Sequence, residues 1–281
     1  MKIFVTGANG QLGREVISQF GKEYEVFGYG KEDFDITNAE SVQSVLVKQS
    51  PNVIIHTAAF TAVDACETNI KHAFEVNAQG AANVANAAKE IGARMFYISS
   101  DYVFNGEKEE PYLENDKPDP LSIYGLSKLA GENMVQSILS NSTIIRTSWL
   151  YGHRGKNFVN TMLHLAQQNK RVRVVYDQVG CPTYTADLVQ VLLALLHKPN
   201  GIYHVSNTGS CSWFEFAQTI YREAGRDSEL VTPCTTEEYG APAKRPKYSV
   251  LAHKELERVL IMPPRRWDYA LIEFLRKESA Q

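Results

Sequence analysis

Short apolar runs alternate with segments of helical periodicity through the first half of the chain. The runs are partly β-branched or aromatic, which favours buried strands. They lie at residues 2–5, 25–29, 51–56 and 95–98. The segments between them are amphipathic or rich in alanine and indicate helices, for example at residues 41–46 and 70–91. Such alternation predicts an α/β fold with a doubly wound parallel sheet, Rossmann-like, and helices on both of its faces.

The alternation weakens after residue 150, where shorter elements and proline-containing turns follow one another. Helices are expected at residues 157–168, 185–197, 213–224 and 268–277, and strands at residues 171–176 and 202–206. This part of the chain is predicted to form a smaller lobe that is interleaved with the first domain.

A glycine turn follows the first predicted strand. Gly7, Gly10 and Gly13 are spaced three residues apart, and residues 14–20 continue at helical period. A helix that begins there has free backbone N–H groups and a positive dipole end, so it can hold a diphosphate. Side chains at Gly7 or Gly10 would keep the phosphates away from the backbone. The turn predicts a dinucleotide site that includes Gly7, Gly10, Gln11, Leu12 and Gly13.

The position of the glycine turn indicates which part of the chain binds the dinucleotide. Residues 1–150 are interpreted as a dinucleotide-binding domain, and residues 151–281 as the interleaved substrate-binding lobe, which closes over the substrate. Segments near residues 171–206 are expected to return to the first domain. Ligands of such sheets bind at the carboxyl ends of the strands, so the chemistry is expected there.

Composition excludes several classes of function. A net charge of −3 gives no electrostatic case for a nucleic-acid or membrane partner. No segment approaches the roughly 20 apolar residues of a membrane span, and the start of the chain lacks a secretory profile. The four cysteines are far apart, without a C-x-x-C pair, and no H-E-x-x-H occurs. We therefore predict no metal held by protein ligands alone and a reducing cytoplasmic location.

The end of the second strand bears on the choice of cofactor. An acidic residue there would favour NAD by bonding the ribose 2′-hydroxyl, but the chain reads Tyr29-Gly30-Lys31. Lys31, together with Arg14 after the last glycine, favours NADPH through its 2′-phosphate. Both could equally be solvated surface charges, and NADH stays possible.

A serine, a tyrosine and a lysine are the candidate catalytic residues. Ser100 follows the strand at residues 95–98, at the expected mouth of the site. Tyr124 and Lys128 lie one turn apart on one face of a helix that Ser122 can cap. Without the glycine turn and Ser100, the spacing of Tyr124 and Lys128 would indicate only a helix at the surface.

The three side chains together suit the reduction of a carbonyl group. A lysine ammonium favours the phenolate of a neighbouring tyrosine, which brings proton exchange within reach at neutral pH. Tyr124 would donate a proton to a carbonyl oxygen that gains negative charge during hydride attack. Ser100 would hydrogen-bond the same oxygen, and Lys128 would also bond the nicotinamide ribose.

The glycine spacing resembles the extended, sugar-nucleotide branch of the short-chain dehydrogenase/reductase superfamily. Within it, segments along nearly the whole chain resemble the dTDP-4-dehydrorhamnose reductase family. They are residues 6–13, 57–64, 99–104, 124–128, 146–152, 177–183 and 244–246. The resemblance implies reduction of the C4 ketone of dTDP-4-dehydro-L-rhamnose by NADPH, which makes dTDP-L-rhamnose for cell-surface polysaccharide.

The resemblance also implies roles for individual residues. Those expected along the cofactor are Asp35 and Ile36 at the adenine, and Ala59, Phe60, Thr61 and Ile98. Those expected toward the dTDP-sugar are Thr61, Val63, Ser100, Asp101 and Trp149, with Asn157, Phe158 and Arg245 at the nucleotide or diphosphate. Trp149 would offer a flat face and one donor, and Arg245 a bidentate phosphate bond.

Several alternatives stay open at this point. Some members of the family form dimers bridged by magnesium. Glu15 matches one of the bridging positions, but the match around Ala186 is ambiguous. The binding of Mg²⁺ and the choice between monomer and homodimer are therefore undecided. A sugar-nucleotide 4-epimerase or 4,6-dehydratase is the alternative enzyme, although dehydratases read Thr-Asp-Glu where this chain has Ser100-Asp101-Tyr102. A non-catalytic NADP-binding regulatory subunit is the third reading.

Overall fold

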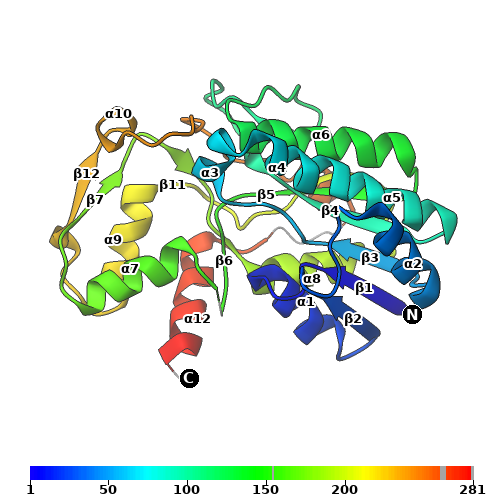
Figure 1. The fold of residues 1–281 in the computed structure, drawn as a ribbon. Coiled ribbons are helices and arrows are strands. Elements are labelled where there is room, and N and C mark those ends of the chain that lie inside the picture. The colour runs from blue at the N-terminus through cyan, green and yellow to red at the C-terminus, as the bar shows by residue number, and fades with distance from the viewer. Residues whose placement is uncertain (154, 260–263, 280–281) are drawn as a thin grey trace.

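The computed structural model describes residues 1–153, 155–259 and 264–279. Its main sheet has six strands, all parallel, in the order β10-β5-β4-β3-β1-β2 (Figure 1). They are β1 (Lys2–Thr6), β2 (Glu25–Tyr29), β3 (Val53–His56), β4 (Arg94–Ser100), β5 (Ser142–Thr147) and β10 (Gly201–His204). The predicted doubly wound, Rossmann-like sheet is confirmed.

Helices cover both faces of this sheet (Figure 1). On β1, Ile3 and Val5 pack in one apolar core with α1 and α8, and Phe4 packs in another with α2, α5 and α6. Burial of both faces explains why these strands are continuous apolar runs. The helices are α1 (Gln11–Phe20), α2 (Ala39–Gln49), α3 (Val63–Thr68), α4 (Ile70–Phe74), α5 (Ala81–Glu90), α6 (Ile123–Ile138) and α8 (Thr185–Leu195).

A second lobe lies beside the sheet, at the left of Figure 1. Its strands form two-stranded pairs: β6 (Leu150–Tyr151) with β9 (Thr183–Tyr184), β7 (Val172–Val175) with β12 (Val231–Cys234), and β8 (Val179–Gly180) with β11 (Cys211–Ser212). Its helices are α7 (Phe158–Gln167), α9 (Trp213–Glu223), α10 (Thr236–Tyr239) and α12 (Trp267–Ser279). α11 (Lys254–Val259) packs near β10 of the main sheet.

The two lobes are interleaved along the chain. After β7, which pairs with β12 in the second lobe, the chain returns to the main domain as α8 and β10. Within the described residues, no helix is long and apolar enough to cross a membrane.

The helix expected at residues 70–91 is interrupted by a π-helical turn at Glu75–Gly80. Asn77 in this turn bonds the backbone of Phe60 on both sides, accepting from its N–H at 2.8 Å and donating to its carbonyl at 3.1 Å. It also donates to Ser127 of α6 at 2.9 Å. The wider turn therefore gives the loop after β3 a fixed position relative to α6.

Candidate active site

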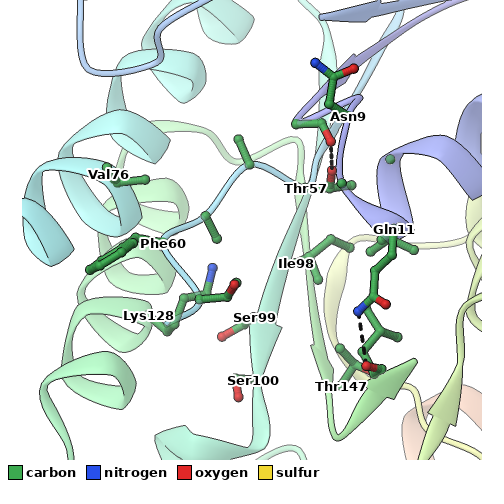
Figure 2. Close-up of a pocket in the computed structure, with 18 of the residues that line it drawn as sticks. Asn9, Gln11, Thr57, Phe60, Val76, Ile98, Ser99, Ser100, Lys128 and Thr147 are labelled. Atoms are coloured by element: carbon green, nitrogen blue, oxygen red, sulfur yellow. Dashed lines mark hydrogen bonds between the residues drawn. The ribbon is translucent and has the colours of Figure 1, made fainter. Parts of the chain in front are cut away.

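A cavity of about 620 Å³ lies at the carboxyl ends of β1 to β5. It is bounded by the glycine turn after β1, the loop after β3, the end of β4 and the face of α6 (Figure 2). Its position is where parallel sheets bind ligands, and its volume suits a cofactor with a small substrate.

The glycine turn forms one wall of this cavity. Gly7 adopts a φ of +67°, and a Cβ there would lie 2.7 Å from the backbone nitrogen of Ala58. The packing of the turn on the loop after β3 therefore also requires glycine at this position, and Gly7 itself lines the cavity. Gly10, Gln11, Leu12 and Gly13 line the cavity at the start of α1, where backbone N–H groups lack helical partners.

Gln11 connects this wall to the second lobe. Its side-chain amide donates to the Leu150 carbonyl at 3.1 Å (Figure 2). It also accepts from the Asn157 side chain at 3.2 Å. Asn157 also caps α7 by accepting from the N–H of Asn160 at 2.9 Å. Both expected residues, Gln11 and Asn157, line the cavity.

The expected catalytic residues meet in the cavity. Ser122 caps α6 as predicted, accepting from the N–H of Gly125 at 3.1 Å, and the helix directs Tyr124 and Lys128 toward the end of β4. Ser100 hydrogen-bonds Tyr124, and its hydroxyl also donates to Asp101 at 3.0 Å. Figure 2 shows Ser99, Ser100 and Lys128 in one space beside β4.

Burial governs the titration of these groups. It raises the pKa of Tyr124 above its ordinary value, and the hydrogen bond with Ser100 opposes this. The expected lowering of the phenol pKa by Lys128 is therefore not found, and Tyr124 keeps its proton at neutral pH. Burial lowers the pKa of Lys128 to about 7, and the charge of Glu132 opposes it.

Asp101 brings a buried carboxyl group to the same cavity. It is 2% exposed, and its Oδ2 has no hydrogen-bond partner among the residues that the structure describes. Burial raises its pKa to about 7, while hydrogen bonds with Ser249 and Ser100 oppose this. An unpartnered buried oxygen at the wall of a cavity is suited to a polar ligand such as a sugar hydroxyl.

Trp149 forms an aromatic wall at the junction with the second lobe. Its φ is +46°, a strained value for a bulky residue. Its ring stacks on Trp213, with centroids 3.5 Å apart and planes at 8°. A Cβ at Gly180 would lie 2.6 Å from the Trp149 ring. Stacking and close packing therefore hold the ring at the cavity wall.

Other expected residues divide into those that line the cavity and those that lie elsewhere. Lys31, Asp35, Ile36, Ala59, Phe60, Thr61 and Ile98 line it. Asp35 also accepts from the Thr37 N–H at 3.0 Å, a bond that lowers its pKa. Asp35 therefore also belongs to a turn before the cap of α2, which was the alternative interpretation from the sequence.

Arg14, Val63, Phe158 and Arg245 are not among the residues that line the cavity. The exposed Arg14 donates from Nε to the Asn9 carbonyl at 3.0 Å, and Val63 begins α3. Phe158 stacks on Phe216 in the core of the second lobe, with centroids 5.6 Å apart. The Arg245 guanidinium pairs with Asp64 at 2.9 Å, so its donors are directed at a protein carboxylate.

The cavity also has lining residues that were not expected from the sequence. They are Asn9, Gly30, Phe34, Thr57, Ala58, His72, Val76, Ser99, Thr147, Ser148, Leu150 and Lys156. Most are sequence neighbours of expected residues, which is a signal that would have found them. His72 and Val76 have no such signal, because only the packing of α4 and the π turn brings them to the site.

Acidic and sulfur ligands do not gather into a metal site in the described structure. Within residues 1–153, 155–259 and 264–279, no group of three His, Cys, Asp or Glu side chains could hold a metal ion.

Comparisons with known proteins agree with this geometry. A family model described as RmlD substrate binding domain matches residues 1–280. The spore coat polysaccharide biosynthesis protein SpsK of Bacillus subtilis is 46% identical, over 99% of this chain and 98% of the relative. The dTDP-4-dehydrorhamnose reductase of Aggregatibacter actinomycetemcomitans is 38% identical, over 96% and 97%. A crystal structure of dTDP-4-dehydrorhamnose reductase from Bacillus anthracis in complex with NADP has a TM-score of 0.96 and 45% identity, covering 98% of this chain and 99% of its own.

Proposed function

This chain belongs to the RmlD substrate binding domain family, and from that premise we propose that it is an NADPH-dependent dTDP-4-dehydrorhamnose reductase. The reaction reduces the C4 ketone of dTDP-4-dehydro-L-rhamnose to give dTDP-L-rhamnose. The observation that carries the proposal is that Ser100, Tyr124 and Lys128 line one cavity with the glycine turn.

The cavity has the features that a dinucleotide requires. The start of α1 offers backbone N–H groups for a diphosphate, and Gly10 adds no side chain between them and the cavity. Lys31 lines the cavity at the end of β2, where a 2′-phosphate would lie, so NADPH is the proposed reductant and NADH the weaker one. Bound NADPH would supply the hydride that reduces the ketone.

Three residues of the chain would donate the proton and stabilise the charge that develops during the reduction. Tyr124 is buried and keeps its proton at neutral pH, so its hydroxyl can donate to the C4 oxygen. Ser100, already bonded to Tyr124, would stabilise the negative charge on the same oxygen. The Lys128 ammonium would stabilise the phenolate that remains after proton transfer.

The sugar nucleotide would bind between the first domain and the second lobe, because residues of both line the cavity. We propose residues 1–150 as the dinucleotide-binding domain, to which α8 and β10 return, and the rest of residues 151–281 as the interleaved substrate-binding lobe. Asp101 and Trp149 would contact the sugar, since one offers an unpartnered buried oxygen and the other a fixed aromatic ring. Soluble NADPH and nucleotide sugar meet in the cytoplasm, which is the proposed location.

An absorbance assay tests the proposal. Purified protein with NADPH and dTDP-4-dehydro-L-rhamnose should consume NADPH in equal amount to the dTDP-L-rhamnose formed. dTDP-glucose, which lacks the ketone, is the control and should leave NADPH unchanged. Conversion of a dTDP-sugar without net consumption of NADPH would instead support an epimerase or a dehydratase.

A further inference from the structure

Glu132 lies behind the proposed active site, two helical turns after Tyr124. Tyr124, Lys128 and Glu132 are spaced four residues apart on α6 and therefore share one face of the helix. Glu132 is 1% exposed and Lys128 is 2% exposed. A carboxylate at this depth is unfavourable unless charged or hydrogen-bonding partners surround it, so its partners indicate its role.

The partners of Glu132 come from two neighbouring strands. Arg146 on β5 donates from Nε to Oε1 at 3.0 Å and from Nη2 to Oε2 at 2.7 Å. Ser99 on β4 donates from its hydroxyl to Oε1 at 2.5 Å, and it lies opposite Arg146 in the sheet register. Because Ser99 directly precedes Ser100, one carboxylate fixes the helix that carries Tyr124 against the strand that carries Ser100.

Lys128 is buried, so a nearby negative charge has a large effect on its pKa. Its Nζ is 4.1 Å from the centroid of the Tyr97 ring, in a site that removes it from water. The titratable groups around it are His56 on β3, Tyr97 on β4, Asp101 after β4, Tyr124 and Glu132 on α6, and Arg146 on β5.

Most of these groups supply no negative charge at neutral pH. Burial raises the pKa of Tyr97 and of Tyr124, and it lowers the pKa of His56 to about 3, so all three are uncharged. Arg146 is a cation that Glu132 already pairs with. Burial raises the pKa of Asp101 to about 7, so its carboxyl group is only partly charged at neutral pH. Glu132 is therefore the group on this helix face whose charge favours the ammonium form of Lys128.

We infer that Glu132, held by Arg146 and Ser99, is a positioning residue for the proposed reduction. It favours the ammonium form of Lys128, and it holds α6 so that Lys128 and Tyr124 stay beside Ser100. The inference rests on the proposed reductase function.

The test compares two substitutions by their pH profiles. Glu132→Gln keeps the shape and an acceptor oxygen but removes the charge. Lys128 should then lose its proton more readily, and the alkaline limb of kcat should move toward acid by about one pH unit or more. Ser99→Ala removes a hydrogen bond and keeps the charge, so its alkaline limb should stay in place even if kcat falls.

A measurement without substrate separates this inference from the proposed function. The pKa of Lys128 can be read by NMR titration of lysine-labelled protein, with Lys128→Arg to assign the signal, and Glu132→Gln should lower it. If Glu132→Gln does not fold, Glu132→Gln with Arg146→Met removes the buried pair together and should still lower the pKa of Lys128, but by less, because loss of the Arg146 cation opposes loss of the carboxylate. Wild-type protein that fails to reduce the ketone would count against the function alone. If Glu132→Gln changes neither the alkaline limb of kcat nor the pKa of Lys128, the inference is overturned.

Discussion

Lys128 should destabilise the fold that it serves. Burial lowers its pKa from the ordinary 10.5 to about 7. The folded chain therefore binds fewer protons than the unfolded chain between about pH 7 and 10.5, and stability rises with pH across that window. Below pH 7 both states carry the ammonium, and burial of the charge costs about 5 kcal/mol in the folded state.

Lys128→Met removes this charge and keeps a side chain of similar length. We expect the variant to be more stable than the wild type by about 3–5 kcal/mol near pH 6, and by only about 1 kcal/mol near pH 9.5. Urea unfolding followed by circular dichroism at the two pH values measures both differences. The variant should also lose activity, since the charge beside Tyr124 is absent.

Lys89→Met is the matched control, because Lys89 is exposed on α5. Its effect should stay within about 0.5 kcal/mol at both pH values, as for other surface substitutions. A Lys128→Met variant that is less stable than the wild type, or whose gain in stability does not shrink as the pH rises, would show that the buried Lys128 charge does not destabilise the fold.

Four other substitutions, in three experiments, test separate parts of the site. Tyr124→Phe should lower kcat by about 10²- to 10⁴-fold and leave the Kd for NADPH unchanged in a fluorescence titration; near-normal turnover would remove Tyr124 as the proton donor. Lys31→Ala should weaken NADPH binding without changing NADH binding, whereas Arg14→Ala should alter neither; equal losses in both variants would contradict the placement of Arg14 outside the cavity. Trp213→Ala removes the ring on which Trp149 stacks and should raise the KM for the sugar by about tenfold with little change in kcat, and an unchanged KM would show that Trp149 does not need this support.

Local signals in the sequence predicted much of the fold and of the site. The glycine turn, the buried parallel strands and the Ser122 cap of α6 each depend on neighbouring residues, so they can be read from short stretches. Tyr124 and Lys128 reach the cavity because a helix fixes residues four apart on one face.

Features that depend on distant contacts could not be read in the same way. Arg245 was expected at a phosphate, but its partner Asp64 lies 181 positions away in the chain. Trp213 reaches Trp149 only because α9 packs at the lobe junction. The high pKa of Tyr124 follows from burial by the whole fold, which the pairing of a tyrosine with a lysine in the sequence does not reveal.

In the proposed reaction, the cavity brings a cofactor hydride and the proton of Tyr124 to one ketone. NADPH deuterated at the transferred position, incubated with the protein and dTDP-4-dehydro-L-rhamnose, tests it directly by NMR of the product. One deuterium at C4 of dTDP-L-rhamnose is expected for each NADPH consumed. Product without deuterium at C4, or NADPH that is not consumed, would contradict the proposed reaction.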